Sequence, residues 1–145
     1  KKPGAGIRWS MYGNHAFAAI AAGALIWALV RPPALTETGT LLLAGWLYLP
    51  GWVSFMILSY ASKIVPFLWW TLKYGQRAGQ PGTPLMAGLL DERKANALLA
   101  AVAVTFFLPA AGLALDLEAM VAAGGALHSA VSLAYMALLG LVFTR

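Results

Sequence analysis

Two histidines are the side chains of this chain whose setting best suits metal chemistry. Both lie inside long apolar stretches, where an imidazole nitrogen can bind the iron of haem b. Helical spacing places Gly124 one turn before His128 and Ser132 one turn after it, and Tyr135 follows on the same face. These polar groups need partners, because lipid offers them none. His128 is therefore the stronger candidate for a haem ligand or a pocket residue.

His15 is the second candidate haem ligand. The residues that continue its helical face are small, namely Ala18, Ala19 and Ala22, with Gly23 beyond them. Small neighbours allow a flat macrocycle to approach, and they equally allow close helix packing, in which each histidine makes an interhelical hydrogen bond. The two histidines differ by roughly 15 Å in expected depth, at about 1.5 Å per residue. A haem shared between them is not expected, so its second ligand would come from another chain or from further sequence.

Other chemistries are disfavoured by what the sequence lacks. The absence of cysteine excludes covalent c-type haem, iron–sulfur clusters, thiolate zinc and thiol catalysis within the chain. No aspartate or glutamate lies inside an apolar stretch, which counts against a proton-coupled exporter. The sequence has no P-loop, HExxH or nucleophile motif. We expect no catalysis by the chain on its own.

The composition predicts that these histidines sit in membrane helices. Hydrophobic residues make up 61% of the 145 residues, charged residues make up 10%, and the mean hydropathy is +0.74. Four apolar stretches, at about 11–30, 38–60, 95–115 and 119–143, are long enough to cross a bilayer as helices. We expect an all-α membrane protein with a single four-helix transmembrane domain over residues 1–145. Because the sequence opens "KKPGAG" without methionine, we expect a processed start or a fragment of a longer chain.

The basic residues predict the orientation of the four spans. One side of a four-span arrangement carries nearly all of them, namely Lys1, Lys2, Arg8, Lys63, Lys73, Arg77, Arg93, Lys94 and Arg145. The other side carries Arg31 together with Glu37, Asp116 and Glu118. Short positive loops stay in the cytoplasm, so both termini are expected inside. The excess positive charge flanks apolar segments and does not indicate binding to nucleic acid.

The second span is followed by a segment that remains apolar, Ile64–Leu72. Pro66 lacks an N–H group and should break the helical hydrogen-bond ladder. Trp69 and Trp70 are amphipathic rings of the kind that settle at headgroup level. We expect an interfacial segment that lies along the membrane surface or packs over the helix ends. Because it is apolar nearly all round, part of it would face a protein neighbour or lipid.

One passage resembles a known group of proteins. "GWVSFMILSYASKIVPFLWWTLKYG", followed by "PLMAGLLDER", is similar to the C-terminal part of bacterial multi-pass membrane proteins related to haem–copper oxidase subunit I or to the haem- and copper-containing NnrS proteins. The residues that carry the match are Gly51, Trp52, Lys63, Ile64, Val65, Pro66, Phe67, Leu68 and Trp70. The resemblance covers about residues 45–94 and assigns no chemical role to Lys63 or Pro66. It implies a respiratory or nitrogen-oxide-related membrane system that handles haem.

Three functions are compatible with these patterns. The leading one is a non-catalytic integral-membrane subunit of a haem-containing respiratory or electron-transfer complex, placed in the bacterial inner membrane with other membrane subunits and lipid as its partners. The alternative is a structural or assembly subunit without a cofactor, whose tryptophans and small residues dock neighbours. A small-molecule or ion conduit is a third interpretation, and the lack of intramembrane charge counts against it.

Overall fold

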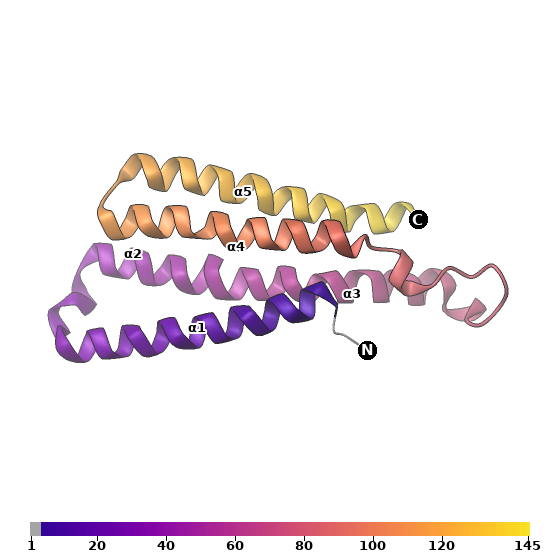
Figure 1. The fold of residues 1–145 in the computed structure, drawn as a ribbon, viewed down its shortest axis with the longest axis horizontal. Helices are drawn as coiled ribbons and strands as arrows, with labels where there is room; N and C mark the ends of the chain where they lie inside the picture. The colour runs from indigo at the N-terminus through magenta and orange to yellow at the C-terminus, as the bar shows by residue number, and fades with distance from the viewer. Residues whose placement is uncertain (1–3) are drawn as a thin grey trace.

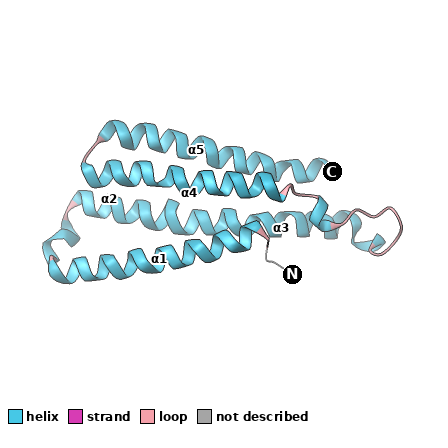
Figure 2. Cartoon of the chain, in the orientation of Figure 1, coloured by secondary structure: helices cyan, strands magenta, loops and turns pink. Residues whose placement is uncertain are grey.

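The computed structural model describes residues 4–145, and these residues form helices joined by turns and one longer loop (Figure 1). Within this part of the chain there is no strand (Figure 2). Lys1 and Lys2, which contributed to the predicted orientation, lie outside the described residues. In chain order the elements are α1 (Ala5–Val30), η1 (Pro32–Thr36), α2 (Thr38–Trp46), η2 (Leu47–Ser54), α3 (Phe55–Tyr74), η3 (Gly75–Arg77), η4 (Met86–Gly88), α4 (Glu92–Leu115), α5 (Glu118–Gly140) and η5 (Leu141–Thr144).

Four helical rods are long and apolar enough to cross a membrane, which confirms the predicted all-α fold of four spans. Their bounds are Ala5–Val30, Thr38–Arg77, Glu92–Leu115 and Glu118–Thr144. The first rod begins earlier than the sequence pattern predicted, because the stretch before Met11 is helical too. The chain therefore has the architecture of a multi-pass membrane protein.

The second rod is much longer than a bilayer requires. It runs without interruption for 40 residues, or about 60 Å at 1.5 Å per residue, against a hydrocarbon core of about 30 Å. Pro66 is buried inside α3 and does not end it. The expectation that Pro66 breaks the helix is therefore wrong, and of the two arrangements expected for Ile64–Leu72 the structure has the one that packs over the helix ends. A single missing N–H removes one hydrogen bond, and the surrounding turns continue the helix.

The end of α3 packs over the ends of the neighbouring helices, which is the second of the two arrangements expected for Ile64–Leu72. The Trp69 indole N–H donates to the Arg145 carbonyl oxygen over 3.2 Å, and its ring meets Phe143 edge-on at 5.3 Å. The Trp70 indole N–H donates to the Pro84 carbonyl oxygen over 2.7 Å. We call the part of α3 beyond Lys63 the α3 extension. It projects past α4 and α5 in Figure 1 and carries the long loop.

The α2–α3 rod contains a π-helical stretch, η2. Pro50 lies within it, and the wider π pairing accommodates a residue that has no N–H to donate. Gly51 lies against α4, since a Cβ atom added there would be 2.6 Å from Cζ of Phe106. The absence of a side chain at Gly51 therefore lets the Phe106 ring lie directly on the rod.

The α4–α5 hairpin is the most closely packed part of the molecule. Its turn is set by Asp116, whose φ of 56° and ψ of 42° are left-handed, and the Leu117 N–H returns to the Gly112 carbonyl oxygen over 2.8 Å. A Cβ at Gly112 would lie 2.8 Å from Val121, and one at Gly124 would lie 2.9 Å from Cδ of Pro109. The two helices approach backbone to backbone because neither glycine has a side chain.

Helix α1 is held at one end and separates from α2 at the other. Near its start Gly6 lies against Ser59 and Ser62 of α3, leaving no room for a side chain. Towards its end a cleft of about 570 Å³ opens between α1, α2 and α4, and Trp27 lies in its wall. Most of the apolar side chains of this half of α1 are exposed, Val30 to 76%. The first rod therefore offers much of its surface to lipid.

Candidate functional site

His128 is buried to 8% exposure in α5, on the side that faces α4 and the α2–α3 rod. The hairpin register determines this position. Pro109 in α4 and Gly124 in α5 are the same number of residues from the turn. Thr105 and His128 are the corresponding pair one helical turn further from it. The close approach at Gly124 therefore brings the imidazole of His128 against the Thr105 hydroxyl, one helical turn further along.

The Thr105 hydroxyl fixes the protonation pattern of the imidazole. Its oxygen lies 2.8 Å from the Ala101 carbonyl oxygen and 3.2 Å from Nδ1 of His128. A hydroxyl has one proton, and the shorter contact, to a carbonyl that can only accept, takes it. Nδ1 of His128 therefore carries a hydrogen and donates it to Thr105, a tautomer assigned from this network. Nε2 is left with its lone pair, and no described residue donates to it.

Two aromatic rings hold the imidazole edge-on. The Trp46 ring lies 5.6 Å from it at an interplanar angle of 64°, and the Phe106 ring lies 6.3 Å away at 63°. Trp46 is itself fixed, because it stacks on Phe106 and its indole N–H donates to the Phe106 carbonyl oxygen over 3.2 Å. The orientation of the imidazole is thus set by a hydrogen bond and two rings, in the way that outer-shell groups orient metal-binding histidines.

The imidazole opens onto a groove between α5 and the α2–α3 rod, which we call the His128 groove. Its volume is about 370 Å³, and its walls are formed by Trp46, Pro50, Ser54, Ile57, Leu58, His128, Ser129 and Ser132. Its polar groups are three serine hydroxyls, the imidazole and the Trp46 indole N–H, and none of the described residues that line it is charged. A site of this kind offers one strong nitrogen ligand among apolar side chains and serine hydroxyls.

The predicted polar face of α5 has three different environments. Gly124 lies against α4 and Ser132 lines the His128 groove. Tyr135 is fully buried, and its hydroxyl donates to the Leu58 carbonyl oxygen over 3.0 Å, so it joins α5 to α3. Tyr135 therefore stabilises the bundle without lining the site.

His15 lies elsewhere. It is exposed on α1, and its Nδ1 is 2.6 Å from the Met11 carbonyl oxygen one turn before it. Helices α1 and α5 do not contact each other in the described bundle. The two histidines are not brought together, and the hydrogen bond of His15 is within its own helix and not interhelical as the packing interpretation proposed.

Among the described residues that line the His128 groove, His128 is the one with a nitrogen of the kind that binds haem iron. Nε2 of His128 is oriented and unpaired among the described residues, which suits iron coordination. Within residues 4–145, the groove lining contributes no second nitrogen ligand and no lysine or arginine to pair with haem propionates. In residues 4–145 there is also no cluster of three or more side chains suited to a metal ion. The other ligand and the propionate partners would come from another chain or from further sequence.

The sequence analysis missed Thr105 and Trp46, the two residues that orient His128. Thr105 could have been found by counting, because it lies as far before the "LDLE" turn as His128 lies after it. Trp46 had no comparable signal, because its approach depends on how the second rod crosses the hairpin. Compared with protein-family models, with curated proteins and with solved structures, the chain matches none.

Proposed function

We propose that this chain is a non-catalytic integral-membrane subunit of a haem-containing respiratory or electron-transfer complex, in which His128 would supply an imidazole ligand at the boundary with a neighbouring subunit. The proposal rests on the orientation and the tautomer of the His128 imidazole. Nδ1 is occupied by Thr105, the ring is held between Trp46 and Phe106, and Nε2 faces no donor among the described residues. When bound, the haem would supply one-electron transfer.

The residues of this chain would orient and shield the cofactor. Thr105 holds the imidazole in the tautomer that leaves Nε2 free to bind, and the two aromatic rings prevent its rotation. Ser129 and Ser132 are small enough to leave room above the α5 surface.

The α3 extension supports a role as part of a larger assembly. Ile64, Phe67, Leu68 and Leu72 lie on it at spacings of three to four residues and are all exposed, Leu72 to 81%. Such spacing makes a continuous apolar stripe along one helical face. A stripe that projects beyond the ends of α4 and α5 suits a groove on another subunit.

The distribution of charge supports an orientation with both termini in the cytoplasm of a bacterium. In residues 4–145 every lysine and arginine except Arg31 lies at the end of the bundle that carries the termini and the long loop. Arg31 pairs with Glu37 at the opposite end, with 2.9 Å between their nitrogen and oxygen atoms. The positive end would face inward by the rule that governs short loops.

A cofactor-free assembly subunit is the second candidate. It is favoured by the lack of charged residues in the His128 groove, since nothing there would neutralise propionates. In this function Nε2 accepts a hydrogen bond from a polar side chain on a neighbouring transmembrane helix. A conduit gains no support, because the buried polar side chains of the described bundle are serines, a threonine and a histidine, with no charged group among them.

The test is the visible spectrum of the complex purified from its native membrane in mild detergent. We expect a Soret band that His128→Ala removes and His15→Ala, the matched control on an exposed helix face, leaves unchanged. His128→Gly with added imidazole should restore the band, which separates lost ligation from lost folding. A wild-type complex without a Soret band, or a band that survives His128→Ala, contradicts the haem proposal. Partner subunits that dissociate on His128→Ala from a complex without haem would favour the assembly role.

A further inference from the structure

We propose that the chain binds an anionic phospholipid between α1 and α4, with part of an acyl chain in an aromatic pocket and the phosphate at the end that carries the termini. The cavity concerned is lined by Phe106, whose ring also lies near the His128 imidazole, and we call it the acyl pocket. The inference does not depend on the proposed function, since none of its wall residues belongs to the His128 groove.

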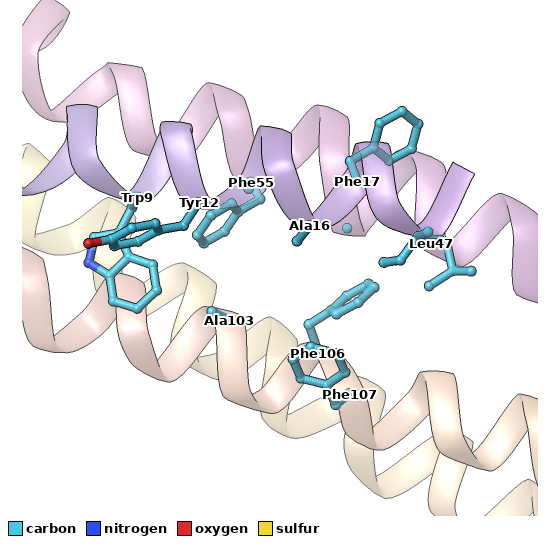
Figure 3. A pocket seen from close by; sticks show the side chains of 12 residues that line it. Trp9, Tyr12, Ala16, Phe17, Leu47, Phe55, Ala103, Phe106 and Phe107 are labelled. Atoms are coloured by element: carbon cyan, nitrogen blue, oxygen red, sulfur yellow. The ribbon is translucent and has the colours of Figure 1, made fainter. Parts of the chain in front are cut away.

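The acyl pocket is apolar almost throughout. It encloses about 150 Å³ between α1, η2, α3 and α4. Figure 3 shows the rings of Trp9, Tyr12 and Phe55 at one end of it and those of Phe106 and Phe107 on α4, whereas the Phe17 ring points away. Its aromatic wall consists of Trp9, Tyr12, Phe17, Phe55, Phe106 and Phe107. An apolar cavity of about 150 Å³ takes a benzene-sized group, or roughly six carbons of a chain. A helix, at about 10 Å across with its side chains, is too wide to enter.

The length of the acyl pocket matches one leaflet. Its wall on α1 extends from Trp9 to Ile20, which is about 16 Å of helix at 1.5 Å per residue. Half of a hydrocarbon core of about 30 Å is about 15 Å. An acyl chain that enters beside Trp9 would therefore end near Ile20, at the middle of the bilayer. The part of the acyl chain that the acyl pocket does not bury would continue along the lipid-facing side of the pocket.

The mouth of the acyl pocket is polar and basic. The Trp9 indole N–H donates to the Asn96 side-chain oxygen over 3.0 Å, which ties α1 to α4 there. Arg8 lies one turn beyond Tyr12 on α1, and Arg93 lies one turn beyond Asn96 on α4. Both arginines are exposed, and neither forms an ion pair within residues 4–145. Two free guanidinium groups at an apolar slot complement a phosphate that carries acyl chains.

The test is lipid retention by the purified chain, measured by native mass spectrometry after equilibration with phosphatidylglycerol or with phosphatidylcholine. We expect selective retention of phosphatidylglycerol. Arg8→Gln and Arg93→Gln should each lower its affinity about fivefold, since one cation near an anionic lipid contributes about 1 kcal/mol. Arg77→Gln, in the exposed loop, is the control for charge and should change nothing.

A second pair of variants tests the apolar part. Ala16→Phe places a ring in the acyl pocket and should reduce retention at least as much as the loss of one arginine, whereas Ala18→Phe, on another face of α1, should not. Equal retention of the two lipids, or retention unaffected by Ala16→Phe, would overturn the proposal. If inorganic phosphate alone displaced the lipid, the proposal would also be overturned, because the acyl chain of the lipid would then contribute nothing to binding. A lipid-free dimer that Ala16→Phe dissociates would show that a second copy covers this surface.

Discussion

Two adjacent glycines of α5 should respond in opposite ways to alanine. A Cβ at Gly124 would lie 2.8 Å from Cβ of Leu108, whereas one at Gly125 meets nothing within 4 Å. Carbon atoms prefer about 3.5–4 Å, so Gly124→Ala must move α4 and α5 apart by about 1 Å. The contact of 3.2 Å between Thr105 and Nδ1 of His128 would then exceed hydrogen-bond length.

The expected change in unfolding free energy follows from two effects. Both variants gain about 1 kcal/mol of helix propensity, and only Gly124→Ala loses about 1–3 kcal/mol to overpacking. Unfolding in mixed micelles, followed by circular dichroism, should show Gly125→Ala more stable than wild type and Gly124→Ala less stable than Gly125→Ala by that overpacking cost. Equal stabilisation of the two variants would refute the close packing of α4 on α5, and with it the position assigned to His128.

Two further changes test the site and the start of α4. Thr105→Val keeps the shape of the side chain but leaves Nδ1–H of His128 unpaired, so it should lower the unfolding free energy by about 1–3 kcal/mol. Thr105→Ser keeps the hydroxyl and should change the unfolding free energy far less. The backbone N–H of Lys94, and then that of Arg93, donate to the Asp91 carboxylate and hold the pKa of Asp91 below its ordinary value. Because the pKa of Asp91 is lower in the folded than in the unfolded chain, the cap stabilises the fold fully when the pH is above the unfolded-state pKa. Its contribution is lost as the pH falls through the folded-state pKa. Thermal melting recorded against pH should therefore show an acid-side decline that Asp91→Asn diminishes, and identical profiles would exclude the cap.

The spans were predictable because their signal is local. Four runs of about 20 apolar residues, separated by prolines or charges, can only be helices if they cross lipid, and the structure has a helix at each. The helix that contains the first expected span begins at Ala5, before the apolar run, although "AGIRWS" contains an arginine. A helix extends past the apolar boundary when its first turns find packing partners, here Ser59 and Ser62 against Gly6.

Pro66 was expected to break the helix, and α3 instead continues through it. Pro66 does remove a hydrogen bond, but Trp69 and Trp70 bind the Arg145 and Pro84 carbonyl oxygens, and these contacts favour a straight continuation. Those partners are distant in sequence, so no local pattern could have revealed them. The hairpin contacts at His128, in contrast, follow from a tight turn by counting residues outward.

Because the helix from Thr38 to Arg77 is unbroken, a tilt of its buried part also moves the α3 extension. About 14 residues, or about 21 Å, lie beyond Lys63. A tilt of about 10° of the buried part, well within what transmembrane helices show, would swing the far end by about 4 Å. Because Trp69 and Trp70 bind the end of the α5 rod and the long loop, that swing would pull directly on both. A displacement at Ile57 in the His128 groove would thus reach the far end of the α3 extension without any hinge between the two places.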